Sequence, residues 1–503
     1  MEISIKKNDK FRITKFIIDE IKIISTGKFE DTSKIYTSVV IGENGVGKSI
    51  LLSKVENIFN HIYKIINMER LPYMRNTISY ELEYKLDGNI YKALYSNNEI
   101  EFYIDDIKIK DKSLFKIPNK VLCCSFQMND KFTFRKENNK EIIKYLGIKT
   151  TPTMTNTSSI SKKICNNILD CINNFEKTES LIKCFDFLNL EKEILITYKL
   201  KQIQRFFEHE ITIDTIVDKI ENGMWKNRKS AAFGKGILEE IRNDKEMLSR
   251  LVRQIYIFMK ERRKGNEMRL RFKLGERYSY FKEYIDLEAL EILIKLDIIS
   301  NPNIKVQKQG YYDLERGSSG ELHILFLLTN ILSNLEENSL ILIDEPEISL
   351  HPSWQIKIIG LIRNILEEVN KSCHIMIATH SHFTVSDLQP SNSSLHILKT
   401  DKYTGNLICE EVTSNTYGWS AENILLNVFG VPSNRNYYLI QKIDKLLSDV
   451  SNGNIKSVIN EKNELQSIAS NLLDSDPLKV IIYKMIKRAE KDYKQDNEYT
   501  NPI

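Results

Sequence analysis

The feature that most constrains the fold of this chain is a glycine-rich turn between a strand pattern and a helical pattern. Residues 35–41 are mostly apolar and β-branched, as in a buried parallel strand. Residues 50–59 carry apolar side chains at helical spacing. Between them stand Gly42, Glu43, Asn44, Gly45, Val46, Gly47, Lys48 and Ser49. The alternative is an ordinary glycine turn between a strand and a helix. The complete motif in its strand–turn–helix context instead predicts a phosphate-binding loop.

Each part of the loop has a predicted role. The glycines let successive backbone N–H groups point at phosphate oxygens, and the start of the following helix adds the positive end of its dipole. Lys48 would reach the β- and γ-phosphates, and the Ser49 hydroxyl would bind Mg²⁺. The cofactors expected here are therefore a nucleoside triphosphate and Mg²⁺.

A second predicted strand ends in two carboxylates. Residues 340–343 form a continuous apolar run that is followed directly by Asp344 and Glu345. Ligands of open α/β sheets bind at the carboxyl ends of strands, so both side chains should face the phosphates. We expect Asp344 to hold the Mg²⁺ shell and Glu345 to orient or deprotonate the attacking water. The alternative is a solvated pair of loop carboxylates.

A third strand pattern, residues 374–379, ends at His380. Considered alone, His380 would be an ordinary loop histidine. Its position at the end of the next predicted strand after Asp344 favours a sensor of the γ-phosphate. His382 is expected to be structural.

The segment Ser318, Ser319, Gly320 and Glu321 precedes a strongly apolar helical pattern at 322–332. A serine N-cap with small neighbours presents free N–H groups and hydroxyls to an anion. The same pattern also describes a plain helix cap with a capping box. Its place just upstream of Asp344 and Glu345 favours the anion-binding interpretation.

Taken together, these motifs resemble those of the ATP-binding-cassette (ABC) ATPases, in their soluble SMC, RecF and OLD-like branch. The resemblance implies an α/β P-loop NTPase head, with a mixed parallel sheet, an antiparallel β lobe and a helical insertion lobe. It implies ATP as the nucleotide and a homodimer, or a higher oligomer, in which residues 318–321 of one copy contact the γ-phosphate bound by the other. It also implies that Gln127, after the apolar run 121–126, binds the nucleotide and its Mg²⁺.

The resemblance is limited in extent and in detail. It covers roughly residues 1–130 and 310–430. Gly317 stands where the family usually has leucine before the signature, and Glu321 replaces the glutamine of transporters. The second change is common in the soluble branch, whereas the first weakens the match.

The chain of 503 residues is long enough for more than one lobe. We expect the N-terminal half of the head at 1–150, a helical insertion lobe at 151–305, the C-terminal half of the head at 306–415, and a helical, partner-binding tail at 416–503. Seven cysteines without a C-x-x-C pair argue against structural zinc and fit a reducing cytoplasm. The longest apolar stretch, 322–335, is too short to span a bilayer, so no membrane association is expected.

Residues 226–277 stand out by their charge. They hold 16 Lys and Arg against 7 Asp and Glu, an excess of nine positive charges. Such a cluster could bind DNA, RNA or an acidic partner, or it could be the solvated surface of a lysine-rich helix. Arg262, Arg263 and Lys264 are candidate contacts, as are Arg269, Arg271 and Lys273, which would share one face of a strand.

The C-terminal part of the sequence contains no Toprim array, and the sequence has no Arg–His pair of the HEPN type and no HNH cluster. A short head without a long arm is similar to the ATPase subunits of bacterial antiphage systems, above all Septu, a group that also occurs beside retrons. This resemblance implies a separate nuclease or toxin as effector. Two alternatives remain open: a RecF-like DNA-binding repair ATPase, and a nucleotide-binding scaffold whose hydrolysis is dispensable.

Overall fold

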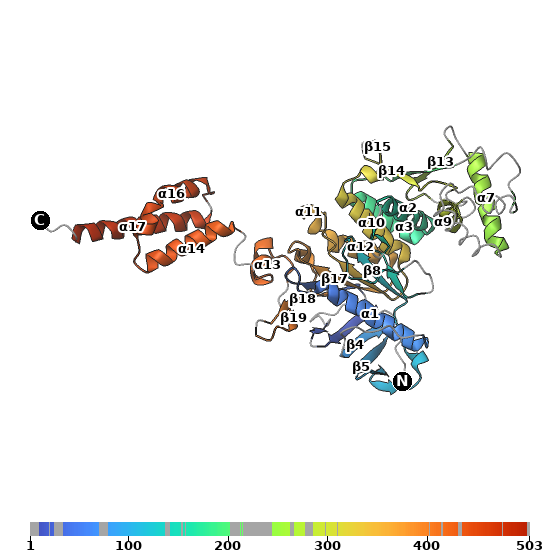
Figure 1. Cartoon of the computed structure of the whole chain (residues 1–503), viewed down its shortest axis with the longest axis horizontal. Helices are drawn as coiled ribbons and strands as arrows, with labels where there is room; N and C mark the ends of the chain where they lie inside the picture. The colour runs from blue at the N-terminus through green and yellow to red at the C-terminus, as the bar shows by residue number, and fades with distance from the viewer. Residues whose placement is uncertain are drawn as a thin grey trace. The chain divides into compact units, whose positions relative to one another are not determined.

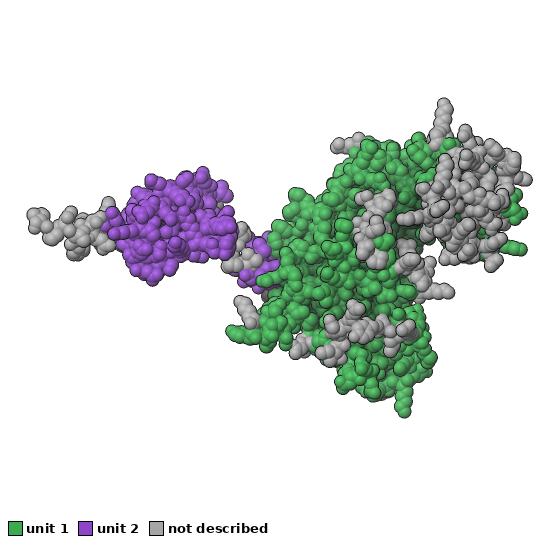
Figure 2. All heavy atoms as spheres, viewed as in Figure 1, with its two compact units in different colours: residues 1–419 green, residues 420–503 purple. Residues whose placement is uncertain are grey.

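The computed structural model describes most of the chain. The described residues are 10–19, 21–24, 34–69, 79–135, 141–151, 154–155, 157–201, 212, 214, 244–261, 266–276, 285–296, 298–308, 310–401, 403–413, 416–430, 435–474 and 476–499. They form two compact units, residues 1–419 and residues 420–503, which are coloured separately in Figure 2.

A seven-stranded sheet organises the first unit (Figure 1). Its strand order is β19-β18-β3-β17-β16-β8-β9, and all neighbours are parallel except β18 and β19. The carboxyl ends of β3, β8, β16 and β17 therefore lie at one edge of the sheet. The strands are β3 (Tyr36–Ile41), β8 (Lys120–Ser125), β9 (Ile143–Tyr145), β16 (Ser339–Asp344), β17 (Cys373–Thr379), β18 (Ser393–Thr400) and β19 (Leu407–Glu411).

Helix α1 (Lys48–Ile66) lies between this sheet and a second, antiparallel one. Its apolar side chains, such as Leu52 and Phe59, share one core with Leu342 of the parallel sheet and Tyr84 of the antiparallel sheet. The second sheet has the order β2-β1-β4-β5-β6-β7. Its strands are β1 (Arg12–Ile18), β2 (Ile21–Ile24), β4 (Ser79–Leu86), β5 (Asn89–Ser96), β6 (Glu99–Ile104) and β7 (Ile107–Ile109). The fold predicted from the motifs, a P-loop head with parallel and antiparallel sheets, is thus present.

Between the two halves of the head, the chain forms helices, the two-stranded sheet β10-β11 and a four-stranded sheet. The four-stranded sheet has the order β13-β12-β14-β15 and is antiparallel. The sequence pattern predicts a helical lobe here and missed these strands, because each is short and β12 pairs with two strands far away in the chain. The elements are β10 (Lys149–Thr151), β11 (Met154–Thr155), α2 (Thr157–Asn173), α3 (Phe175–Phe187), β12 (Glu193–Lys199), α7 (Lys245–Glu261), β13 (Glu267–Lys273), α9 (Leu287–Lys295), β14 (Asn303–Gln307) and β15 (Tyr311–Asp313).

Helix α7 begins at Lys245, and residues 215–243 before it lie outside the described part of the chain. The remaining elements of the first unit are η1 (Lys112–Leu114), η2 (Leu314–Arg316), α10 (Ser319–Asn334), α11 (Pro352–Gln355), α12 (Ile358–Val369) and η3 (Thr384–Asp387).

The second unit is helical and has an apolar core of its own. That core joins Ile443 and Leu446 to Leu465 and Ile482. The helices are α13 (Ala421–Asn427), α14 (Tyr437–Ser451), α15 (Lys456–Asn460), α16 (Lys462–Asn471) and α17 (Pro477–Tyr499). In the described parts of both units, none of the helices combines the length and the apolar character that a bilayer crossing requires.

Candidate functional site

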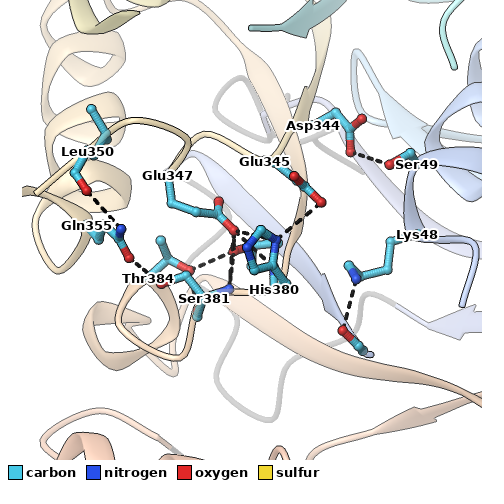
Figure 3. Close-up of polar contacts among 12 residues, drawn as sticks. Lys48, Ser49, Asp344, Glu345, Glu347, Leu350, Gln355, His380, Ser381 and Thr384 are labelled. Carbon is cyan, nitrogen blue, oxygen red and sulfur yellow. Dashed lines mark hydrogen bonds and ion pairs between the residues drawn. The ribbon is translucent and has the colours of Figure 1, made fainter. Parts of the chain in front are cut away.

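The glycine-rich loop has the geometry that its sequence requires. It connects the end of β3 to the first residue of α1, and Gly45 and Gly47 have φ angles of 81° and 105°, which favour glycine. At Gly42 a Cβ atom would lie 2.3 Å from the carbonyl oxygen of Leu398. The Nζ of Lys48, labelled in Figure 3, donates to the carbonyl oxygen of Gly42 at 2.9 Å. It also donates to the carbonyl oxygen of Glu43 at 3.0 Å. Any side chain at these glycines would thus disturb the loop.

Ser49 and Asp344 meet at the carboxyl edge of the sheet. The Oγ of Ser49 donates to the Oδ1 of Asp344 at 2.9 Å. Asp344 is 1% exposed, and burial raises the pKa of its carboxyl to about 7. Its Oδ2 is buried and has no hydrogen-bond partner among the described residues. A hydroxyl beside a buried carboxylate with one free oxygen fits an octahedral Mg²⁺ that keeps several of its waters.

Glu345 is held on both carboxylate oxygens. Its Oε2 accepts a hydrogen bond of 2.5 Å from the Nε2 of Gln127, and its Oε1 lies 3.2 Å from the Nδ1 of His380. The hydrogen bond from His380 lowers the pKa of Glu345 and raises that of the imidazole. The backbone φ of Glu345 is +51°, an uncommon value for a residue with a side chain. The structure thus brings together Gln127, Glu345 and His380, which the sequence predicted as one site.

Glu347 is a further member of this cluster that sequence reasoning gave no role. It is 3% exposed, and its Oε1 accepts hydrogen bonds from the Oγ1 of Thr379 (2.5 Å) and from the backbone N–H groups of His380 (3.0 Å) and Ser381 (3.2 Å) (Figure 3). Burial raises the pKa of this carboxyl. The carboxylate therefore fixes the backbone that carries His380. In the sequence, Glu347 is marked only by its position, two residues after Glu345 and directly after Pro346.

Ser318, Ser319, Gly320 and Glu321 form the start of α10. Ser318 is the N-cap, and its Oγ accepts the N–H of Glu321 at 3.2 Å, while the Oε2 of Glu321 accepts the N–H of Ser318 at 3.0 Å. A Cβ at Gly320 would lie 2.9 Å from the carbonyl oxygen of Ser349, so this turn touches the loop that follows Glu345. The contacts of the described residues do not join 318–321 to the glycine-rich loop of the same chain. The predicted contact with a second copy remains a prediction.

Much of the basic range 226–277 lies outside the described residues, including Arg262, Arg263 and Lys264. Within β13, the side chains of Arg269, Arg271 and Lys273 are exposed on one face, as the alternation predicts. Each has an acidic partner. Arg269 pairs with Glu267 at 2.9 Å, Arg271 with Glu193 at 3.2 Å and Lys273 with Glu276 at 3.3 Å. These three side chains therefore add less free positive charge than the sequence count indicates.

Comparison with protein families gives a match at residues 216–386, to a model described as "AAA domain, putative AbiEii toxin, Type IV TA system". The match includes 318–321, Asp344, Glu345 and His380. It excludes the glycine-rich loop.

Two curated proteins are also similar. Septu protein PtuA of Bacillus thuringiensis is 29% identical over 146 residues, which are 28% of this chain and 34% of PtuA. Protein ea59 of Escherichia phage lambda is 26% identical over 181 residues, 33% of each chain. The chain thus spans about a third of the length of the curated relatives it matches.

Among solved structures, the SMC head domain from Thermotoga maritima aligns with 80% of this chain and 99% of its own at 12% identity, with a TM-score of 0.30. A Pyrococcus yayanosii Smc head with coiled coil and joint aligns with 83% and 99%, at 12% identity and a TM-score of 0.32. The fold assignment rests instead on the strand order and on the position of the loop 42–49. The family model and PtuA confirm the predicted resemblance to ATPase domains and to a Septu protein.

Proposed function

We propose that this chain binds and hydrolyses ATP at the edge of the seven-stranded sheet. The observation that carries the proposal is the convergence of Ser49, Asp344, Glu345 and His380 beside the glycine-rich loop. Ser49 comes from the first turn of α1, Asp344 and Glu345 from the end of β16, and His380 from the residue after β17. They meet at the carboxyl ends of the parallel strands, which is where α/β folds bind nucleotides.

Each side chain has a distinct part in the proposed reaction. The N–H groups of 42–47 and the Lys48 ammonium hold the phosphates. Ser49, Asp344 and Gln127 would hold Mg²⁺, which neutralises phosphate charge when it is bound. Glu345 orients a water molecule and accepts its proton as the water attacks the γ-phosphorus. His380 donates a hydrogen bond to a γ-phosphate oxygen, and Glu347 keeps its backbone in place.

We further propose that two copies close head to head on ATP in the bacterial cytoplasm, with residues 318–321 of each copy sealing the site of the other. Closure would license a separate effector, a nuclease or a toxin, through the tail at 416–503. The likeness to Septu protein PtuA supports a role in antiphage defence. The exposed position of Ser319 at the start of α10 supports a contact made between copies.

The test uses the purified chain with Mg²⁺ and ATP. Wild type should hydrolyse ATP, whereas Lys48→Ala should neither bind nor hydrolyse it. Glu345→Gln should bind ATP, lose at least about a hundredfold in kcat, and remain dimeric in light scattering with ATP. Turnover by Glu345→Gln at the wild-type rate would refute the role of Glu345. Affinity purification followed by mass spectrometry should recover an effector subunit with the chain.

Two competing functions make different predictions. A scaffold with dispensable hydrolysis would keep phage protection in Glu345→Gln and lose it in Lys48→Ala. A RecF-like repair ATPase would bind DNA directly through 226–277, with an affinity that falls steeply as salt rises. The excess charge of that range favours this second function, whereas the ion pairs of Arg269, Arg271 and Lys273 argue against it.

A further inference from the structure

Helix α10 contains a buried histidine one turn after its N-cap. His323 is 2% exposed and lies two residues after Glu321, while the next residues of the helix are apolar. A polar ring in such a place requires a partner for its nitrogen atoms. The position of this ring connects α10 to two other parts of the proposed ATP site.

The first connection is a hydrogen bond to the loop after β16. The Nδ1 of His323 lies 2.6 Å from the carbonyl oxygen of Ile348. A carbonyl only accepts, so Nδ1 carries the hydrogen and the tautomer is fixed. Burial lowers the pKa of this imidazole to about 4, so the ring is neutral near pH 7. Ile348 in turn donates its N–H to the carbonyl oxygen of Glu345 at 3.3 Å.

The second connection is a ring stack on the end of β8. The rings of His323 and Phe126 are nearly parallel, at 13°, with their centroids 4.4 Å apart. The residue after Phe126 is Gln127, which donates to Glu345 at 2.5 Å. His323 therefore supports both segments that meet at the Glu345 carboxylate, one through its nitrogen and the other through its ring face.

The loop 345–350 has a backbone conformation that requires contacts with other parts of the fold. Glu345 and Ser349 both have left-handed φ angles, 51° and 61°, which cost conformational energy in residues with side chains. Gly320 closes on the same loop from α10, since a Cβ there would lie 2.9 Å from the Ser349 carbonyl oxygen. The start of α10 therefore contacts this loop at two adjacent points, through Gly320 and through His323.

We propose that His323 is a positioning residue that couples the segment 318–321 to Glu345. This inference deepens the proposed ATPase function and rests on it. When a second copy brings its nucleotide to residues 318–321, α10 shifts and His323 carries this shift to the loop 345–350 and to Gln127. Each site of a dimer would thus sense whether the other has closed.

Two substitutions separate the two connections. His323→Phe keeps the stack but leaves the Ile348 carbonyl without its donor, and we expect kcat to fall about tenfold with little change in KM. His323→Asn offers a new N–H donor without the stack, so it should restore part of the rate. Thr329→Val is the matched control, because Thr329 is buried in the same helix and bonds only within it, to Leu325 at 2.6 Å. It should hydrolyse ATP at nearly the wild-type rate.

A measurement that does not depend on ATP hydrolysis also tests whether His323 supports the loop 345–350. In hydrogen–deuterium exchange, the amides of 345–350 should exchange about tenfold faster in His323→Phe than in wild type and should stay protected in Thr329→Val. A double-mutant cycle with Ser318→Ala should be non-additive in kcat.

The possible failures are distinguishable. If wild type hydrolyses no ATP, the proposed function is refuted, and the exchange measurement still decides whether His323 supports the loop. Wild-type exchange and wild-type kcat in a folded His323→Phe would overturn the inference. Equal slowing in Thr329→Val, or strict additivity with Ser318→Ala, would also overturn it.

Discussion

Ser49 and Asp344 stand 295 positions apart in the chain, yet a hydrogen bond of 2.9 Å joins Ser49 Oγ to Asp344 Oδ1. This contact joins the first turn of α1 to the end of β16, and Asp344 Oδ2 has no hydrogen-bond partner among the described residues. Alanine has no hydroxyl to bind Mg²⁺, so Ser49→Ala should raise the Mg²⁺ concentration for half-maximal ATP hydrolysis at least about tenfold. A Mg²⁺ titration measures this. Ser49→Thr keeps the hydroxyl and should behave like wild type; equal losses in both variants would contradict a metal-binding role.

His380 should contribute to the rate more than to nucleotide affinity. Its Nδ1 lies 3.2 Å from Glu345, and its backbone is fixed by Glu347. Loss of one preorganised donor to the γ-phosphate should lower kcat of His380→Ala about a hundredfold, with a small change in KM. The control is His382→Ala, which should keep the wild-type rate. Steady-state kinetics on both variants measure the difference. Comparable kcat values for the two variants would refute the sensor role.

Glu347 should matter through the hydrogen bonds that it accepts. Glu347→Ala leaves the N–H groups of His380 and Ser381 without their acceptor, which should lower the free energy of unfolding by about 1–3 kcal/mol and slow hydrolysis. Glu347→Gln keeps an acceptor oxygen and should lose less of both. Urea unfolding and ATPase rates, measured on the same preparations, check this order. Equal losses in the two variants would show that the charge, and not the acceptor oxygen, is required.

Acid should destabilise the first unit through its buried histidines. Burial lowers the pKa of His323 and His396 to about 4 and that of His374 to about 3. In the unfolded chain these rings take up protons below about pH 6.5, while the folded ones stay neutral. The unfolded state then binds more protons, so the free energy of unfolding falls as the pH drops from 6.5 towards 4.

At pH 5 each buried histidine should cost about 2 kcal/mol relative to pH 7. Urea unfolding followed by tryptophan fluorescence measures the change, because Trp225, Trp354 and Trp419 all belong to the first unit. His396→Leu removes one of the three contributions and should narrow the difference between pH 7 and pH 5. An unchanged difference in that variant would refute this explanation.

Strand β13 of the basic range 226–277 should contribute little to nucleic-acid binding. Because Arg271 pairs with Glu193, Arg271→Ala should change DNA affinity little. Removing the charges of Arg262, Arg263 and Lys264 together should lower the slope of log affinity against log salt by up to about 3 if all three contact phosphates. Filter binding at several salt concentrations measures both. A large loss from Arg271→Ala alone would favour the RecF-like alternative.

The local motifs made much of the site predictable. A strand, a glycine turn and a helix in sequence fix the backbone of 42–49, and the rule that parallel strands end at one edge brought Asp344 and His380 towards it. Gln127 was predicted through the family resemblance, and the structure places its side chain on Glu345. The positions of Ser49, Asp344 and His380 were predictable because they depend on short-range patterns and on strand direction, whereas the position of Gln127 came from the resemblance.

Other features depend on contacts that one sequence does not encode locally. The strands β12 and β14 are neighbours only because the chain returns after about a hundred residues, so their short apolar patterns could not be distinguished from helix. Glu347 and His323 were missed for a similar reason. Their roles come from the backbone groups that they meet, in Ser381 and Ile348, and side-chain spacing gives no sign of such partners.

Residues 420–503 enclose an apolar core formed entirely by their own helices. Substitutions within this second unit can therefore accumulate without repacking the core of the first unit. If residues 420–503 bind the effector as proposed, substitutions on the outer surfaces of α14 to α17 should change which effector is bound and leave ATP hydrolysis unchanged.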